Sequence, residues 1–467
     1  MLGQACFDSD RPLTGMEIEC NLVDAGYQPA MSNRAVLDAI ADPAFQSELG
    51  AYNIEFNVPP HPLPGHTGLD LEAEVRASLN DAEIKAAAGG AHIVMIGILP
   101  TLMPEHLDSG WMSESTRYAA LNDSIFTARG GQIPINISGP EPLNWQAVSI
   151  APESACTSMQ LHLQLSPETF AANWNAAQVV AGPQLALGAN SPYFFGHLLW
   201  AETRIEVFAQ STDPRPEEQK SQGVRPRVWF GERWIDSALD LYQENIRYFP
   251  SLLPEVSDED PVAELAAGRA PQLSELRLHN GTVYRWNRPV YDVVQVDGVG
   301  HPHLRLENRV LPAGPSVIDM LANSAFFYGM LRSLSEADDP LWARMDFAVA
   351  ERNFVAAARY GIDARMHWPG LGTGTREVTA RKLVLDTLLP IADEGLRRWG
   401  VDAEVRDRFL GVIEGRARAG RNGASWQVST VRRLEDGGMT RPAALAEMLR
   451  RYCEHMHANE PVHTWDL

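Results

Sequence analysis

In residues 14–24, acidic and apolar side chains alternate along the sequence TGMEIECNLVD, and this pattern constrains the fold of the chain more than any other. Because successive side chains of a strand point to opposite faces, Glu17 and Glu19 would share one face and the apolar residues the other. Two carboxylates about 7 Å apart on one strand repel each other, and the stretch contains no Lys or Arg to compensate them. The pattern fits either a solvated edge strand or a pair of oxygen ligands for hard cations such as Mg²⁺.

Three later segments repeat the alternation of polar and apolar side chains and are predicted to be strands. They carry Glu55 in residues 53–58, Gln160 and His162 in residues 158–165, and Arg305, Glu307 and Arg309 in residues 303–310. We also predict a strand at residues 202–208, which carries Arg204, and a β-hairpin at residues 276–286, which carries Arg285 and turns at Asn280-Gly281. Each strand alone is compatible with ordinary amphipathic alternation, and a single His with a structural role. Together, however, the polar faces separate metal-type ligands from arginines.

The order of the predicted elements indicates an α+β fold. Residues 92–99 are predicted to form a buried strand, Asp297-Gly298 a second hairpin turn, and residues 69–88, 113–128 and 166–187 helices. Further helices are predicted at residues 316–334, 342–360, 376–400, 401–417 and 440–457. Strands followed by helices predict a mainly antiparallel sheet with helices behind one face. We divide the chain into a catalytic sheet domain, residues 14–335, and a helical C-terminal part, residues 336–467, which packs against it and is not independent.

Charge and motif content exclude several classes of function. The chain has 60 Asp and Glu residues against 39 Lys and Arg residues, and this net charge of −21 argues against nucleic acid or an anionic membrane as partner. We find no apolar run of transmembrane length and no signal-peptide pattern, and the four cysteines lack CxxC spacing, so we expect a cytoplasmic protein. None of the three lysines lies in a G-x-x-x-x-G-K-[ST] context, which excludes a P-loop.

The combined polar faces are suited to phosphoryl transfer. ATP needs Mg²⁺ on its phosphates, and Mg²⁺ takes oxygen ligands such as carboxylates. Catalysis of phosphoryl transfer then depends on positioning and on cations that stabilise the transferring group, a role for which arginine is well suited.

The same residues form a series of short motifs that resembles the glutamate–cysteine ligase superfamily, and especially its carboxylate–amine ligase branch. The motifs occur in the family's order from about residue 14 to residue 362. They are Gly15-Met16-Glu17-Ile18-Glu19, Ile54-Glu55-Phe56 with Pro59-Pro60, Ile96-Gly97-Ile98-Leu99-Pro100, Gln160-Leu161-His162, Asn190-Ser191-Pro192-Tyr193, Leu306-Glu307-Asn308-Arg309 and Ala357-Ala358-Arg359-Tyr360-Gly361.

The resemblance implies a glutamine-synthetase-like fold, in which a curved, mainly antiparallel sheet has helices on its convex face and binds ATP with two or three Mg²⁺ ions on its concave face. It also implies a role for each matching residue. Arg309 would stabilise the transferring phosphoryl group, and Glu48 would stand where some relatives place a further acid. The implied metal ligands are Glu17, Glu19, Glu55, His162 and Glu307. We add Arg204 and Arg285 as candidates for binding a substrate carboxylate, from their position and charge alone.

Two departures from the branch leave the substrates open. Ile18 stands where many members carry a third consecutive acid, and Gln160 replaces the first residue of a His-x-His pair. Neither change removes an expected metal ligand. The sequence identifies neither the amine substrate nor the residues that contact adenine.

The leading hypothesis is an ATP- and Mg²⁺-dependent ligase that joins an amino-acid carboxylate, with glutamate as the expected acid, to an amine through an acyl phosphate. Its expected partners are these small molecules. The sequence leaves open whether the protein forms a homo-oligomer. Two alternatives are a phosphagen-kinase-like phosphotransferase and a non-catalytic descendant that binds an amino acid or a nucleotide. A loop should exclude water from the site, and the candidates are residues 211–227 and 370–375.

Overall fold

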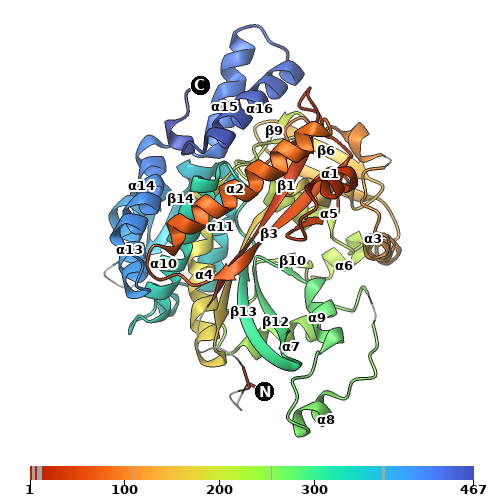
Figure 1. The fold of residues 1–467 in the computed structure, drawn as a ribbon, viewed down its shortest axis with the longest axis vertical. Helices are drawn as coiled ribbons and strands as arrows, with labels where there is room; N and C mark the ends of the chain where they lie inside the picture. The colour runs from red at the N-terminus through yellow and green to blue at the C-terminus, as the bar shows by residue number, and fades with distance from the viewer. Residues whose placement is uncertain (3–5, 8–12, 109, 254, 371–373) are drawn as a thin grey trace.

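The computed structural model describes residues 1–2, 6–7, 13–108, 110–253, 255–370 and 374–467. At its centre lies a curled antiparallel sheet (Figure 1) with the strand order β12-β13-β7-β1-β3-β2, in which β4 also pairs with β1. Every pair of neighbouring strands in it is antiparallel. The strands are β1 (Thr14–Val23), β2 (Phe45–Ser47), β3 (Asn53–His61), β4 (His92–Val94), β7 (Met159–Leu165), β12 (Asn287–Val296) and β13 (Val299–Asn308).

The strand register brings the polar side chains together on one face of this sheet. Glu19 of β1 lies opposite Glu55 of β3, and His162 of β7 lies opposite Glu307 of β13. The side chains that alternate with them, such as Ile18, are buried on the other face. The hairpin between β12 and β13 turns at Asp297-Gly298, as predicted, with both residues at positive φ.

Helices cover the apolar face of the sheet, which confirms the predicted fold class. Tyr328 of α10 (Val317–Ser335) donates hydrogen bonds to the carbonyl oxygens of Gly15 and His162, at 3.3 and 3.0 Å. Helix α4 (Pro167–Gly188) begins at the predicted cap, where the Ser166 hydroxyl accepts a hydrogen bond from the Thr169 N–H. The other long helices of this layer, which Figure 1 shows beside α4 and α10, are α2 (Thr67–Ala88), α11 (Phe347–Tyr360), α13 (Leu389–Arg398) and α14 (Ala403–Ala419).

Smaller elements surround the polar face and the edges of the sheet. On the N-terminal side they are α1 (Asn33–Ile40), α3 (Thr116–Arg129), the hairpin of β5 (Ile133–Ser138) and β6 (Pro142–Ala147), the 3-10 helix η2 (Ala151–Ala155), β8 (Tyr193–Phe194) and β9 (His197–Leu198). After these come α5 (Arg204–Ser211), α6 (Glu217–Ser221), β10 (Val228–Trp229), α7 (Ala238–Tyr248), α8 (Pro261–Ala266), α9 (Ser274–Gly281) and β11 (Tyr284–Arg285).

The C-terminal part contains more than the predicted helices. Residues 376–400 begin with a strand, continue as a short helix and a π-helical turn at Val384–Leu388, and only then form α13. An additional helix, α15, follows α14. The remaining α-helices and β-strands are β14 (Arg365–Pro369), β15 (Thr375–Thr379), α12 (Ala380–Leu383), α15 (Gly423–Asp436) and α16 (Arg441–Ala458). A buried ion pair of 2.7 Å between Arg416 and Asp319 joins α14 to α10. The proposed division at residue 335 stays a prediction.

Three predictions of local structure are wrong. Asn280 and Gly281 end helix α9 instead of turning a hairpin, because the Asn280 amide is buried between the Pro289 carbonyl and the Asn245 amide. Arg204 lies in the first turn of helix α5, not on a strand. The apolar run at residues 92–99 is buried as predicted, but only its first three residues pair in the sheet. The backbone of its later residues forms hydrogen bonds with other segments. For example, the Gly97 N–H donates to the Asn190 carbonyl.

None of the helices among the described residues combines the length and the apolar character needed to cross a lipid bilayer.

Candidate active site

Three carboxylates gather where strands β1 and β3 meet. One oxygen from each of Glu19, Glu48 and Glu55 lies within 4.8 Å of the others. Glu48 comes from the turn between β2 and β3, whereas Glu19 and Glu55 are cross-strand neighbours. Carboxylate oxygens grouped in this way are suited to a hard divalent cation. We call these three residues the acid cluster.

Burial and mutual repulsion dominate the electrostatics of the acid cluster, although the charges of Arg309 and Arg204 act in the opposite direction on Glu19. Burial, reinforced by the charge of Glu19, raises the pKa of Glu48 to about 7. Burial and the charges of Glu48 and Glu17 raise the pKa of Glu55 to about 10. The carboxylates therefore cannot all ionise at neutral pH without a cation, as expected for closely spaced acids. The acid cluster fits a divalent metal ion.

A second group of ligand-type residues lies on the neighbouring strands. His162 Nε2 is 3.0 Å from Glu17 Oε1, and Glu307 faces His162 across the β7–β13 pair. Nδ1 of His162 is buried and makes no hydrogen bond within the described residues. A buried imidazole with an unpaired ring nitrogen beside two carboxylates also fits a metal ion. We call Glu17, His162 and Glu307 the histidine group.

Two arginines distinguish the histidine group from the acid cluster. Arg288 Nη2 lies 2.8 Å from Glu307 Oε2, and Arg309 Nη1 lies 3.2 Å from Glu307 Oε1. Burial would raise the pKa of Glu307, but the two guanidinium groups outweigh it and lower the pKa to about 2. The charges of Glu19 and Glu17 also act on Arg309, so its guanidinium interacts electrostatically with both groups of acids.

A groove of about 660 Å³ leads away from the histidine group along the polar face of β12 and β13. Its lining residues include Glu17 and His162, Val294 and Val296 of β12, and Pro59 and Pro60 of β3. Most of its lining is apolar. Such a groove, which ends at metal-type ligands, is suited to a flat aromatic base with an attached polyphosphate.

The comparisons with known proteins agree with this geometry. The family model described as glutamate-cysteine ligase family 2 matches residues 13–455. The chain belongs to glutamate–cysteine ligase family 2. Membership in this family identifies the chain as an ATP-dependent ligase that forms a carbon–nitrogen bond, which confirms the activity class implied by its motifs.

Two solved structures share the fold of this family 2 chain at low sequence identity. Glutamate–cysteine ligase from Francisella tularensis, in complex with AMP, has a TM-score of 0.59 and 12% identity, with 97% of this chain and 90% of that chain covered. A bifunctional glutathione synthetase from Pasteurella multocida has a TM-score of 0.56 and 13% identity, with 96% of this chain but only 53% of that chain covered. The comparison with curated proteins found no match.

The two arginines predicted to bind a substrate carboxylate each have an acidic partner in the structure. Arg204 is buried, 3.0 Å from Glu202, and donates to the carbonyl of Val310. Arg285 is buried, 2.9 Å from Glu244, with Trp229 against its guanidinium. Both side chains contribute to the packing around the site, and a role for them in binding a substrate carboxylate stays a prediction.

The structure describes one of the two predicted lid segments completely and the other in part. Residues 211–227 contain helix α6, and Arg129 donates hydrogen bonds to the carbonyls of Asp213 and Arg215 at their start. In the Gly-rich segment 370–375, residues 371–373 lie outside the described residues. A lid role for either segment stays a prediction.

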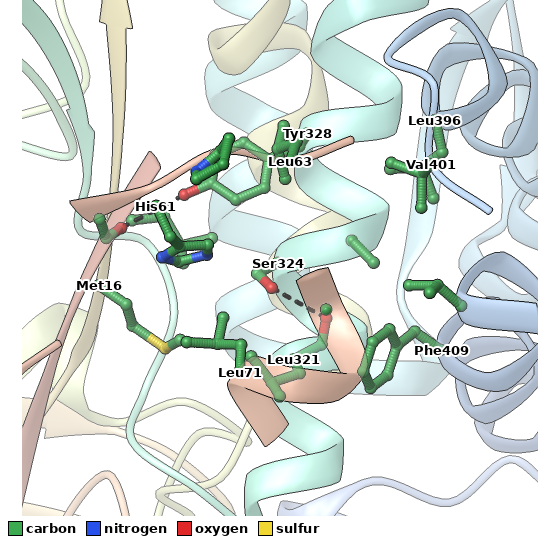
Figure 2. A pocket seen from close by; sticks show the side chains of 16 residues that line it. Met16, His61, Leu63, Leu71, Leu321, Ser324, Tyr328, Leu396, Val401 and Phe409 are labelled. Carbon is green, nitrogen blue, oxygen red and sulfur yellow. Dashed lines mark hydrogen bonds between the residues drawn. The ribbon is translucent and has the colours of Figure 1, made fainter. Parts of the chain in front are cut away.

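The apolar face of the sheet also contains a cavity, of about 40 Å³. Figure 2 shows side chains of β1, α2, α10 and α14 around it, with Met16, Leu71, Leu321 and Phe409 among them. Met16 points away from the face that carries Glu17, because the two residues are adjacent on a strand. This cavity therefore belongs to the packing between the sheet and its helices.

Proposed function

We propose that this family 2 ligase uses glutamate as its acid and activates it as an acyl phosphate before the amine attacks. The observation that supports this proposal is the pair of ligand groups on one face of the sheet, with Arg309 in contact with Glu307 and within electrostatic reach of Glu19. A ligase of this type must hold two anions side by side, a triphosphate and a carboxylate. Two separate cation sites that share one arginine meet this requirement.

In this proposal the nucleotide lies in the groove beside the histidine group, and the acid lies at the acid cluster. The valine side chains of β12 would contact adenine, and the triphosphate would extend toward Glu17, His162 and Glu307. Two or three bound Mg²⁺ ions would neutralise the phosphates and the reacting carboxylate. Arg309 would compensate the charge of the transferring phosphoryl group. The cytoplasmic location and a homo-oligomeric state stay predictions from the sequence.

The direct test is a product screen. Purified protein is incubated with ATP, Mg²⁺ and glutamate together with each of a panel of amines that includes cysteine, and ADP release and new amide masses are measured. We expect ADP and an amide in equal amounts with at least one amine. Phosphate transfer to an amine or guanidine, without an amide, would instead support the phosphotransferase alternative.

We expect oxygen-18 in the carboxylates of glutamate to appear in inorganic phosphate during amide formation. When the carboxylate attacks the γ-phosphorus, one of its oxygens becomes the bridge to phosphorus and leaves with the phosphate once the amine attacks. Mass spectrometry of the released phosphate measures the label, and unlabelled glutamate is the control. Amide formation without label in phosphate would exclude the acyl-phosphate route.

We also expect tight ATP binding to require Mg²⁺. Glu17 and Glu307 line the place where the triphosphate would lie, and without a cation they repel it. Titration calorimetry should give at least a tenfold weaker affinity in EDTA than in Mg²⁺, a difference of about 1.4 kcal/mol or more. Equal affinities in the two conditions would contradict the assignment of the histidine group as metal ligands.

A further inference from the structure

A further carboxylate, that of Glu153, lies at the site but outside both proposed ligand groups. Glu153 belongs to the 3-10 helix η2, which precedes β7. Neighbouring bonds fix this helix: the Ser154 hydroxyl lies 3.0 Å from that of Tyr52, and the Ile150 N–H donates to Asn122 of α3 at 3.1 Å. The Glu153 side chain is therefore held in place by its surroundings.

One carboxylate oxygen of Glu153, Oε2, is buried without a hydrogen-bond partner among the described residues, although the residue as a whole is partly exposed. Burial and the charge of Glu19 raise its pKa to about 7, and Arg309 acts in the opposite direction. The charged and titratable groups that act on Glu153, or on which it acts, are Glu19, Glu48, Tyr52, Tyr118, Cys156, Tyr284 and Arg309.

Five residues after Glu153, the Ser158 N–H donates a hydrogen bond to Glu19 of the acid cluster, and the charges of Glu19 and Arg309 both act on the Glu153 carboxylate. Glu19 belongs to the acid cluster, where the activated carboxylate would lie, and Arg309 lies where the phosphoryl group would be transferred. The amine must approach the acyl carbon at this place. A buried, unpaired carboxylate is costly unless a positively charged group meets it there.

We propose that Glu153 receives the protonated amine substrate and acts as the general base that makes it nucleophilic. This inference rests on the proposed ligase function and adds the residue that serves its second half-reaction. It also assigns the substrate class, a primary amine that enters as an ammonium ion.

The proton and electron balance of the step is complete. Glu153 takes one proton from the ammonium group, and the freed nitrogen lone pair forms the bond to the acyl carbon. The bond between that carbon and the bridging oxygen breaks, and its electron pair leaves with inorganic phosphate. The surplus proton on nitrogen passes to the phosphate, and Glu153 releases its own proton to water.

Hydroxylamine allows the base to be tested separately from the rest of the reaction. It attacks acyl phosphates but is largely unprotonated at neutral pH, so it needs little help from a base. We expect Glu153→Gln to slow amide formation by about 10²- to 10⁴-fold at pH 7. Amide formation is measured with the amine that gives most product in the screen, and cysteine is the first candidate. Hydroxamate formation from glutamate, ATP and hydroxylamine should fall much less, by under about tenfold.

The pH dependence gives a second readout. Amide formation by Glu153→Gln should rise with pH, because the fraction of free amine rises, by about tenfold per pH unit below the pKa of the amine. Glu153→Asp, which keeps a carboxylate, should recover part of the rate. Glu206→Gln is the matched control: this carboxylate lies on the adjacent helix α5 and already accepts a hydrogen bond from Gln210, so both reactions should be unchanged.

The possible results separate this inference from the proposed function. Equal losses of amide and hydroxamate in Glu153→Gln would overturn the inference and indicate a metal-ligand or structural role. Unchanged amide formation would also overturn it. If the unsubstituted protein forms neither product, the proposed ligase function itself fails.

Discussion

Glu55→Gln is expected to lower amide formation at least about 100-fold and, at the same time, to make the metal-free protein more stable. The loss follows because Glu55 would be a direct metal ligand, and even the loss of an outer-shell partner of a metal site typically costs 10- to 100-fold. The gain follows because Glu55 lies within the acid cluster, where without metal its charge is opposed by Glu48, Glu17 and Glu19.

The sign of the stability change can be derived from the pKa of Glu55, which the folded protein raises from 4.5 to about 10. Between these values the folded protein holds a proton that the unfolded chain releases. The stability contribution is therefore complete below about pH 4.5 and is lost as the pH rises toward 10. Glutamine is neutral at every pH, so Glu55→Gln does not lose stability in this way as the pH rises. A tenfold change in a protonation equilibrium corresponds to about 1.4 kcal/mol. The difference in the free energy of unfolding between Glu55→Gln and the unsubstituted protein is therefore measurable.

The measurement is urea unfolding in EDTA at several values between pH 5 and pH 9. The free energy of unfolding of Glu55→Gln should exceed that of the unsubstituted protein by an amount that grows with pH. Glu74→Gln, on the exposed side of α2, is the control and should change neither stability nor activity. A variant that is inactive because it is less stable would show that Glu55 has a structural role.

The alternating strands explain why so much of this site could be predicted from the sequence. In β1, β3, β7 and β13 the period of two assigns each side chain to a face, and one buried face then fixes the register. Glu17, Glu55, His162 and Glu307 accordingly lie on the polar face. For Arg204 the segment was too short for its apolar spacing to distinguish a strand from a helix turn.

Two of the residues that the sequence did not place in the site come from segments without a regular period. Glu48 lies in a turn, and only the resemblance to the family indicated it. Glu153 lies in a 3-10 helix of five residues, and the position of this helix depends on contacts with α3 and α5, which are distant in sequence. Arg288, by contrast, lies on the regular strand β12, opposite Glu307, and the sequence analysis set no bounds for this strand. Long-range packing, and not local pattern, places Glu48 and Glu153.

Arg309→Lys is expected to lower turnover by about 10³-fold while ATP still binds in the presence of Mg²⁺. Arginine presents a planar fork of donors that can bridge oxygens of the transferring phosphoryl group, whereas lysine offers one point charge. Arginines that stabilise this transition state are worth about 10³- to 10⁵-fold. The Arg309 guanidinium contacts Glu307 Oε1, and the charges of Glu19 and Glu17 act on it, so it interacts with both ligand groups.

The chain provides a matched control in Arg288, which contacts the other oxygen of the same carboxylate. If both arginines only neutralise Glu307, Arg288→Lys and Arg309→Lys should lose activity and stability to the same extent. If Arg309 acts on the transferring group, its substitution should lower kcat while the Kd for ATP stays within a few-fold, and Arg288→Lys should lower kcat by less than about tenfold. Equal effects of the two substitutions on kcat would therefore reject the catalytic role of Arg309 and leave charge compensation of Glu307 as its function.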